Sequence, residues 1–474
     1  MTYFFQYLIY FYATGLVLFY LLLMVMSYIN TVRYRHRYAQ HEEDYLKKFP
    51  QEAPGISIVA PAYNEEVIIE DSVRSLLNLD YPKFEVVIVN DGSKDKTLDL
   101  MIEKFELKEV PYYYVYKVYC KNVKRILKST NPEFSKLVVV DKENGGTKAD
   151  AMNAGVNVAA YDYFINTDID CILAPDTLTK VILPVLSSEE HVIAVGATMR
   201  MVNGCEIKNG KIERVRPPSD FIPLFQEVEY LRSYLVAKMG LSLANVIPNV
   251  SGGFGLFDKN VVINSGGFDS ASHAEDMDMT VRMIAYMREN KRKYRIVQCP
   301  YTCCWTEGPP SLRVLNRQRT RWGRGMLQFI IDHRKFLFNP KYGRLGFVVM
   351  PYILLFEFLA PIIEICGLVF LLSLVITDKV NYDTFWLMLS YAYLVGLSVS
   401  ILTVSVDLLL KKWYKNFSEY AKIVFVSAFE AVLYHPLVVV FTLRGYIQYI
   451  VKKDFKWGKM TRKGFSPNSK AKTI

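Results

Sequence analysis

Apolar residues are concentrated at the two ends of this sequence. The stretch Tyr3–Ile29 contains no charged residue. At ~1.5 Å per residue it is long enough to cross a hydrocarbon core ~30 Å thick, so we predict a transmembrane helix. A cleavable signal peptide would need a basic start, a shorter apolar run and a small-residue cleavage site, and the stretch has none of these.

Three more apolar stretches lie near the C-terminal end: Leu345–Ile376, Thr384–Leu410 and Lys422–Ile450. Prolines interrupt the first at Pro351 and Pro361 and the last at Pro436. The sequence between the two apolar ends has mixed polarity and is long enough for a globular domain. The pattern predicts a transmembrane helix over 1–32, a domain over 33–340, transmembrane or interfacial helices over 341–451, and a basic tail over 452–474.

The net charge of +10 arises mainly beside the apolar stretches. Basic residues follow the first and third of them: Arg33, Arg35, Arg37, Lys411, Lys412 and Lys415. Because Lys- and Arg-rich segments stay inside, we expect an integral protein of the cell (inner) membrane with a cytoplasmic domain. Attraction to anionic lipid explains the positive charge better than nucleic-acid binding does, since the basic residues do not form a patch that also contains aromatic residues. The seven cysteines show no paired metal spacing, as expected in a reducing compartment.

The number of spans conflicts with this orientation. One span before the domain and three after it would place the basic tail outside. Either Lys422–Ile450 is a re-entrant or hairpin element broken at Pro436, which we favour, or a stretch near Leu345–Pro361 lies in the interface.

Short β-rich runs alternate with helical ones along residues 55–200: "GISIVAPAYNE", "EVVIVNDGS", "KLVVVD", "YFINTDID" and "VIAVGA". The alternation predicts an α/β fold with parallel strands joined by helices. Ligands bind beyond the carboxyl ends of such strands. Asp91 and Asp168 directly follow two of the runs, so we expect both at one edge of the sheet.

Several short motifs carry candidate chemistry, each beside a plainer interpretation. Asp91-Gly92 is a ligand site or a common turn. Asp168 and Asp170 are hard oxygen ligands suited to Mg²⁺ or Mn²⁺ on a nucleotide diphosphate, or residues of a solvated loop. In "HAEDMDM", the acids around Asp276 suit a helix N-terminus, but that does not account for the glycines of the preceding "SGGFGLFDKNVVINSGGFD".

The stretch "NRQRTRWGRG" is the most informative. On a helix, Gln318 and Arg321 share a face with Trp322 beside them. An amide, a guanidinium and an indole can together bind a sugar face and a pyrophosphate. A basic interfacial helix is the alternative.

With these motifs in order from Gly55 to Gly325, the sequence resembles the membrane-integrated, processive, inverting family-2 glycosyltransferases, which include cellulose, chitin, hyaluronan and poly-N-acetylglucosamine synthases. The resemblance implies a GT-A-type nucleotide-binding domain inserted between transmembrane helices. It implies donor and nucleotide contacts at Ala60, Tyr63, Glu65, Asp91, Lys148 and Asp168, with Asn153 just behind Lys148.

The same resemblance assigns roles in catalysis. Asp91 matches the reader of the uracil base, Asp168 and Asp170 the metal pair, and Asp276 the general base. Gln318, Arg321 and Trp322 match the motif that holds the acceptor end and the leaving diphosphate. A single inverting displacement needs no covalent nucleophile. The sequence departs from the family at Asn90, often an aspartate, at Ala274, usually a threonine, and in its small number of apolar stretches.

We therefore expect an enzyme that polymerises sugar from a UDP-sugar donor, with UDP-N-acetylglucosamine as first choice, into an exported polysaccharide. Its partners would be the donor, a glycan acceptor and membrane lipid, with an accessory export protein left open and no nucleic acid. The alternative is transfer of one sugar to a lipid-linked acceptor; a catalytically inactive membrane scaffold is a third. Ionisable residues at apolar depth would line a glycan route or hydrogen-bond between helices: Glu357, Glu364, Asp407, Glu430 and His435.

Overall fold

A computed structural model describes residues 2–37, 46, 48–208 and 210–451 of the chain. The chain divides into two compact units. The sheet unit contains the described residues between 33 and 216 together with 247–308, and the helical unit contains residues 2–32, 217–246 and 309–451. The predicted basic tail, 452–474, lies outside the described residues, and the predicted domain boundaries stay a prediction.

The sheet unit is built on a ten-stranded sheet in the order β3-β4-β5-β2-β1-β6-β11-β8-β12-β7. Its strands are β1 (Ile56–Ala62), β2 (Phe84–Asn90), β3 (Leu107–Glu109), β4 (Val123–Ser129), β5 (Leu137–Lys142), β6 (Tyr163–Thr167), β7 (Ile172–Leu173), β8 (Val192–Met201), β11 (Phe254–Asp258) and β12 (Arg295–Thr306). A separate hairpin pairs β9 (Glu206–Lys208) with β10 (Lys211–Arg214).

The five predicted β-rich runs are all strands: β1, β2, β5, β6 and β8. The first four form a parallel block in which β5 pairs with β2, β2 with β1 and β1 with β6. All six residues of β5 and all ten of β8 are buried, as expected for strands covered on both faces. Beyond β6 the sheet becomes mixed, because β11 inserts antiparallel between β6 and β8.

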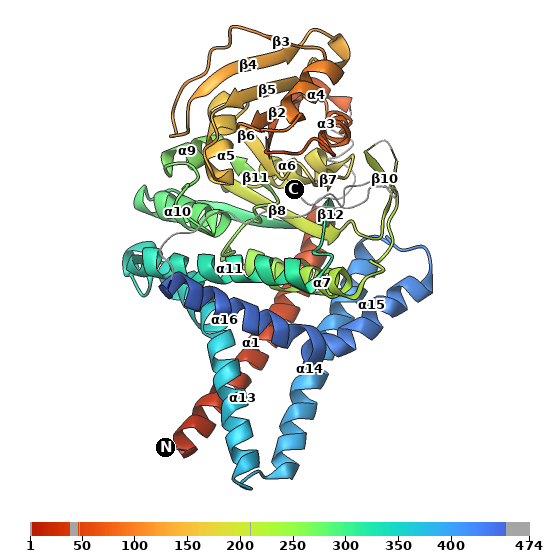
Figure 1. The fold of residues 1–474 in the computed structure, drawn as a ribbon. Coiled ribbons are helices and arrows are strands. Elements are labelled where there is room, and N and C mark those ends of the chain that lie inside the picture. The colour runs from red at the N-terminus through yellow and green to blue at the C-terminus, as the bar shows by residue number, and fades with distance from the viewer. Residues whose placement is uncertain (1, 38–45, 47, 209, 452–474) are drawn as a thin grey trace. The chain divides into compact units, whose positions relative to one another are not determined.

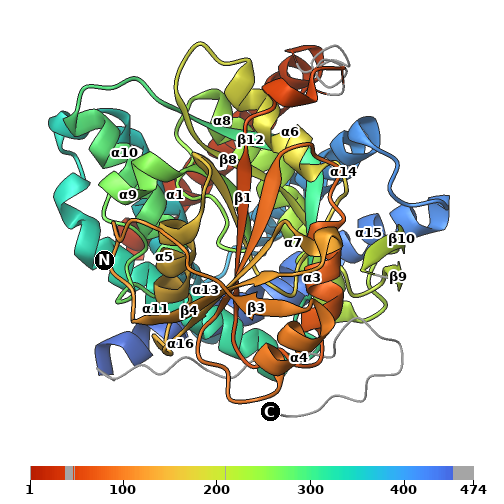
Figure 2. The ribbon, with the colours of Figure 1, turned by 90° about the horizontal axis from the view of Figure 1, so that it is seen from above.

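Helices cover both faces of the sheet: α3 (Ile69–Leu77), α4 (Thr97–Lys104), α5 (Lys148–Val158), α6 (Thr177–Leu186), α9 (Lys259–Asn264) and α10 (Glu275–Glu289). Figure 2 shows α5 and α9 on one side of the central strands and α3 and α4 on the other. Thr147 caps α5 by accepting from the N–H of Asp150. Gly155 lets α5 approach β1 closely, since a Cβ there would overlap the Val59 side chain.

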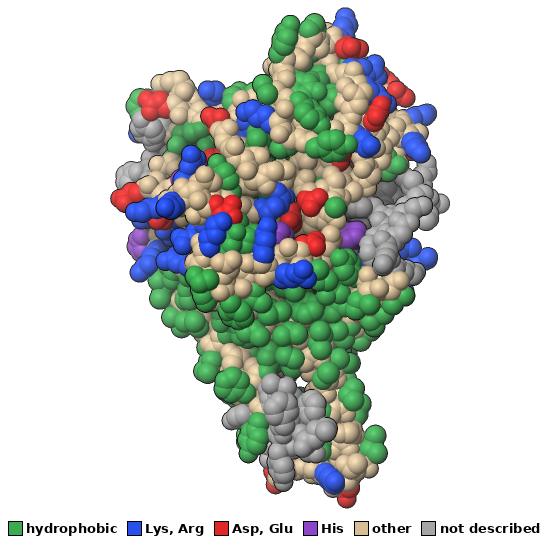
Figure 3. All heavy atoms as spheres, turned by 90° about the vertical axis from the view of Figure 1, so that its left-hand side faces the viewer, with side chains coloured by type: hydrophobic (Ala, Val, Ile, Leu, Met, Phe, Trp, Pro, Cys, Tyr) green, Lys and Arg blue, Asp and Glu red, His purple; other side chains and the backbone are tan. Residues whose placement is uncertain are grey.

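The helical unit consists mainly of long apolar helices. Its elements are α1 (Thr2–Arg37), most of which lies in this unit, α7 (Phe221–Arg232), α8 (Met239–Leu243), α11 (Leu312–His333), α12 (Met350–Tyr352), α13 (Ala360–Ile376), α14 (Tyr382–Leu410), α15 (Phe417–Phe429) and α16 (His435–Val451). Four segments of the described chain are long and apolar enough to cross a membrane: Phe11–Arg37, Leu345–Ile376, Phe385–Leu410 and Phe417–Val451. Figure 3 shows hydrophobic side chains covering much of this unit's surface on one face.

The last apolar segment does not form a hairpin. A π-helical turn, Glu430–Tyr434, joins α15 to α16 directly before the His435-Pro436 step, where proline supplies no N–H. Beyond this turn α16 continues away from α15, and both helices lie across one end of α13 and α14 instead of running beside them (Figure 1). The structure therefore shows no hairpin at this break. A re-entrant or interfacial course depends on the position of the membrane and stays a prediction.

Candidate active site

Two acidic segments follow the parallel strands on either side of β1, at the same edge of the sheet unit. Asp91 directly follows β2, and Asp168 directly follows β6. Both strands pair in parallel with β1, so their carboxyl ends point the same way. The placement predicted for these two residues is thus found, whereas their roles stay a prediction.

Lys148 connects Asp168 to the glycine-rich segment that precedes β11. Its Nζ donates to Asp168 Oδ1 and, at 2.5 Å, to the backbone oxygen of Gly252. Burial alone would lower the pKa of Lys148, but the charges of Asp168 and Glu275 outweigh it and raise the pKa. Lys148 is therefore an ammonium at neutral pH, placed where it can also face a phosphate.

Asp168, Asp170 and Cys171 form a cluster that could hold a metal ion, since one ligand atom from each lies within 4.8 Å of the others. Carboxylate oxygens are the donors that Mg²⁺ and Mn²⁺ prefer, so the two aspartates fit such an ion. Cys171 was not predicted as a ligand. Its thiol donates weakly to the backbone oxygen of Gly253 at 3.8 Å.

Asp276 lies at the start of α10, close to the same glycines. Its Oδ2 accepts from the N–H of Gly252 at 3.0 Å, and its Oδ1 accepts from the N–H of Met277 at 2.8 Å. The neighbouring Asp278 is instead bound by Arg282, with Oδ2 2.5 Å from Nη2, inside the unit. Asp276 is thus joined to the segment that contacts Lys148.

The asparagine at position 90, where the family described above often has an aspartate, has a structural explanation. Asn90 ends β2, is buried, and donates through Nδ2 to Asp141 Oδ1 at 2.9 Å. Asp141 also binds Arg125 at 3.0 Å. An aspartate at position 90 would bring a second buried carboxylate against Asp141 and lose this donor.

The remaining predicted donor residues of the sheet unit differ in their surroundings. Ala60 is completely buried within β1, so any contribution to nucleotide binding comes through the shape of that strand. Tyr63 is 45% exposed just beyond β1, and the N–H of Glu65 donates to Thr97 Oγ1 at 2.8 Å. Asn153, expected behind Lys148, binds the backbone oxygens of Tyr119 and Phe268, which gives it a structural task.

Gln318, Arg321 and Trp322 belong to the helical unit, where they lie on α11 as predicted for a helix. Gln318 Oε1 accepts from Gln226 Nε2 on α7 at 3.1 Å. Trp322 is 38% exposed, which leaves part of its indole available to a ligand.

Sequence reasoning did not identify Arg319, which contacts Trp322 of this motif. Its guanidinium lies 4.4 Å from the Trp322 ring centroid. It also makes two hydrogen bonds to Glu229, at 2.8 and 2.5 Å, and one to the Tyr434 hydroxyl at 2.9 Å. Four polar residues of α7 contact surrounding elements of this unit: Gln226, Glu227, Glu229 and Arg232.

Two of the predicted ionisable residues in apolar segments form a pair, and a third has a basic partner. His435 Nε2 lies 2.8 Å from Glu364 Oε2. Arg232 binds Glu430 through two hydrogen bonds of 2.6 and 2.9 Å. For Glu364, Glu430 and His435, interhelical bonding is therefore the role that the contacts support.

Two family models match this chain. The one described as glycosyl transferase family 2 matches residues 57–117 and 121–264. The one described as glycosyl transferase family group 2 matches residues 220–399. The two matches together span both acidic segments, the glycine-rich segment, Asp276 and the Gln318–Trp322 motif.

Curated relatives and a solved structure resemble it as well. Poly-beta-1,6-N-acetyl-D-glucosamine synthase of Staphylococcus aureus (strain COL) is 30% identical over 306 residues, which is 65% of this chain and 61% of that protein. The Staphylococcus epidermidis protein of the same name is 28% identical over 336 residues, 69% and 67% of the two chains. A mannosyltransferase from Pyrobaculum calidifontis, solved with GDP-Man and Mn²⁺, aligns with a TM-score of 0.50 at 16% identity over 91% of this chain and 100% of its own, a likeness of fold.

Proposed function

This chain belongs to glycosyl transferase family 2, and from that premise we propose that it polymerises sugar units from a UDP-sugar donor. It is a glycosyltransferase with a GT-A-type α/β domain inserted between apolar helices long enough to span a membrane. The donor, the product and the processive mode are our proposal. The chain spans 61% of the length of the first curated relatives it matches.

The observation that carries the proposal is the position of Gly252 between two charged groups. Its carbonyl oxygen accepts from Lys148 Nζ, and its N–H donates to Asp276 Oδ2. Since Lys148 also binds Asp168, one short segment joins the proposed diphosphate site to the proposed base. An acceptor hydroxyl beside Asp276 would therefore lie near the anomeric carbon of a donor whose phosphates lie near Lys148 and Asp168.

In the proposed displacement, Asp276 takes the proton from the attacking acceptor hydroxyl as the oxygen bonds to the anomeric carbon. The bond from that carbon to the diphosphate breaks, and UDP leaves with the electron pair. Lys148 stabilises the charge that grows on the leaving diphosphate. Asp168 and Asp170 would hold a Mg²⁺ or Mn²⁺ ion, which would supply Lewis-acid neutralisation of that charge.

We propose N-acetylglucosamine as the sugar, because both curated relatives described above carry the name poly-beta-1,6-N-acetyl-D-glucosamine synthase. Retention of Gln318, Arg321 and Trp322 supports repeated addition over transfer of a single sugar. Trp322 offers a partly exposed indole to a pyranose ring, and Gln318 is oriented by Gln226.

We place the sheet unit in the cytoplasm, against the cell (inner) membrane. With α15 and α16 counted as an interfacial element, three of the four candidate segments cross, and the basic tail returns to the side of the catalytic domain. The partners are then the donor, the glycan acceptor and membrane lipid. An accessory export protein would be an additional partner.

The test is UDP release by the full chain in lipid nanodiscs, over a panel of UDP-sugars with Mg²⁺ or Mn²⁺, with the products sized on a gel. We expect release with UDP-N-acetylglucosamine and a ladder of long products. A single-sugar product on a lipid would establish the non-processive alternative. No release with any UDP-sugar, while a GDP-sugar or a lipid-linked donor is used, would overturn the donor class.

A further inference from the structure

Lys142 is a completely buried cation that contacts Asp91. It is the last residue of β5 and is 0% exposed. Its Nζ lies 2.5 Å from Asp91 Oδ1, 2.5 Å from Asp150 Oδ1 and 2.6 Å from the backbone oxygen of Glu143. The contacts to Asp91 and Glu143 are hydrogen bonds, and Asp150 adds a close charge contact, so the three oxygens together restrict the position of the ammonium.

The loop that follows Lys142 closes around Asp91. Asn144 Nδ2 donates to the backbone oxygen of Asp91 at 2.6 Å, and the N–H of Gly145 donates to Asp91 Oδ1 at 3.0 Å. Asp91 Oδ1 therefore receives two donors. Within the described residues Asp91 Oδ2 has no hydrogen-bond partner. The Asp91 side chain is nearly buried, at 8% exposed. One carboxylate oxygen is thus held in place, and the other stays available to a ligand.

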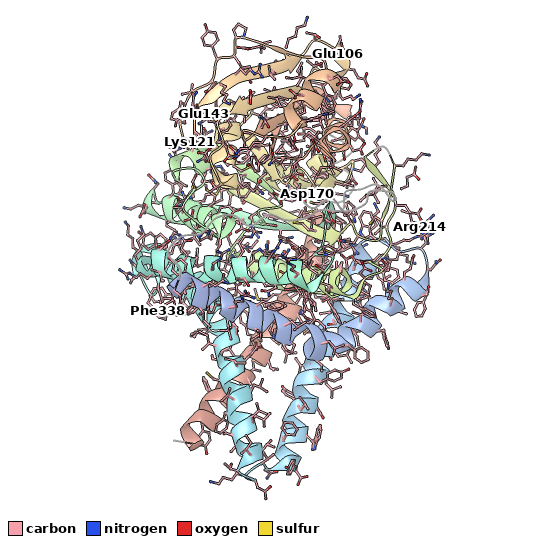
Figure 4. The ribbon with its side chains drawn as sticks, in the orientation of Figure 1. Glu106, Lys121, Glu143, Asp170, Arg214 and Phe338 are labelled. Carbon is pink, nitrogen blue, oxygen red and sulfur yellow. The ribbon has the colours of Figure 1, made fainter. Side chains whose placement is uncertain are left out.

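The cluster contains two carboxylates for one ammonium. Asp150, in the first turn of α5, is 2% exposed, and its Oδ2 accepts from the N–H of Lys121 at 2.9 Å. Figure 4 labels Lys121 and Glu143, the neighbours of this cluster. Burial would lower the pKa of Lys142, but the adjacent carboxylates of Asp150 and Asp91 raise it. The cation therefore persists at the pH of the cytoplasm.

We propose that Lys142 is a positioning residue for base recognition, fixing the Asp91 carboxylate so that Oδ2 accepts a hydrogen bond from the imide N–H of a uracil base. This inference rests on the proposed function, in which Asp91 contacts the base of the donor. Cytosine lacks that N–H, so a fixed acceptor at this position selects against it. Lys142 touches no reacting atom and acts through Asp91.

The test compares UDP with UDP methylated at N3, which lacks the donor hydrogen, on the full chain in nanodiscs with Mn²⁺. A hydrogen bond to a charged group corresponds to about 10- to 100-fold in affinity, which is the UDP preference we expect for the native protein. In the Lys142→Met/Asp150→Asn double variant, the preference should fall to roughly 3-fold or less. Affinity for inorganic pyrophosphate should stay unchanged.

In the native cluster, Asp91, Lys142 and Asp150 carry a net charge of −1. In the double variant Asp91 alone of the three positions is charged, so the net charge stays −1 and the buried charge does not grow. Asp150→Asn alone retains the contact between Lys142 and Asp91 and should keep the native preference for UDP. Lys180→Met removes another ion-paired lysine of this unit, which lies on α6 with its Nζ 2.7 Å from Asp176 Oδ2, and should also leave that preference unchanged.

Lys142→Gln is measured in parallel, because it keeps a hydrogen-bond donor near Asp91 without the charge; its preference for UDP should lie between those of the native protein and the double variant. A native-like preference in the double variant or in Lys142→Gln would overturn the inference. A loss of UDP and pyrophosphate affinity by the same factor would also overturn it, because that result indicates general structural damage. If the native protein itself shows no preference for UDP, the proposed function fails at base recognition, and the inference fails with it.

Discussion

The N–H of Gly252 donates to Asp276 Oδ2 at 3.0 Å, so this carboxylate is oriented by the same glycine whose carbonyl accepts from Lys148. Its other oxygen accepts from the N–H of Met277. A carboxylate held through both oxygens has little freedom to rotate, which suits a base that must meet one hydroxyl in one direction. The geometry therefore predicts that sugar transfer is more sensitive to substitution of Asp276 than to substitution of Asp278.

Asp276→Asn should lower sugar transfer by about 10²- to 10⁴-fold, the contribution usual for a general base. The amide keeps the shape of the side chain but cannot accept the acceptor proton. UDP binding should persist, because Asp276 is not placed on the nucleotide. UDP release and UDP affinity are measured on the same nanodisc preparation.

Asp278→Asn is the matched control. Its carboxylate binds Arg282 within the unit, so the variant should melt at a lower temperature, by about 2–4 °C for each kcal/mol lost. Transfer by the protein that stays folded should be close to native. If the two variants lost transfer equally at native stability, Asp276 would not be the base.

The activity should not decline through a titration of Lys148 between pH 7 and 9.5. Its pKa is raised above the ordinary lysine value, because the charges of Asp168 and Glu275 outweigh the effect of burial. The stability contributed by this ammonium is therefore fully present below about pH 10.4 and is lost only as the pH rises through the higher folded value.

Lys148→Arg, which stays protonated throughout, is the comparison. The pH–rate profiles of the native protein and this variant should have the same shape over that range, whatever their absolute rates. A decline in the native profile alone would show that Lys148 loses its proton there.

Glu229→Ala should destabilise the helical unit strongly. It leaves Arg319, whose side chain is 4% exposed, as a buried cation without its carboxylate, which costs about 3–5 kcal/mol. Glu70→Ala removes the partner of Arg74 in an exposed pair and should cost about 0.5 kcal/mol or less. Thermal unfolding of both variants in detergent checks the difference; equal melting temperatures would contradict the buried pair's importance.

The sequence predicted the strands that bear the site because each is a short, continuous apolar run followed by polar residues. β2 and β6 end directly before Asp91 and Asp168, so their order along the chain was enough to place both acids at one edge. β11 was not predicted, because its short apolar run contains Gly255 and directly follows Gly252 and Gly253, a composition typical of a loop. In the structure all five of its residues are buried.

Lys142 and Arg319, which contact predicted site residues, could not be identified from the sequence, because their acidic partners are distant along the chain. Lys142 at the end of "LVVVDK" has no local sign of burial; its carboxylate Asp91 lies 51 positions earlier. Arg319 is one of several arginines in a basic motif and could not be distinguished from the others, and its partner Glu229 lies 90 positions earlier. Pairing over such separations follows from the packing of the helices and strands, not from local pattern.

Trp322→Ala should shorten the polysaccharide more than it slows UDP release. The indole is 38% exposed and is backed by Arg319, whose guanidinium lies 4.4 Å from the ring centroid. Loss of stacking on one sugar weakens retention of the growing chain by about 2- to 10-fold, so each product should dissociate after fewer additions. Phe338→Ala removes another exposed aromatic of this unit and should leave the ladder unchanged. An unaltered ladder in Trp322→Ala would mean that the acceptor end is held elsewhere, because a stacked ring cannot be removed from a processive site without increasing the rate at which the product leaves.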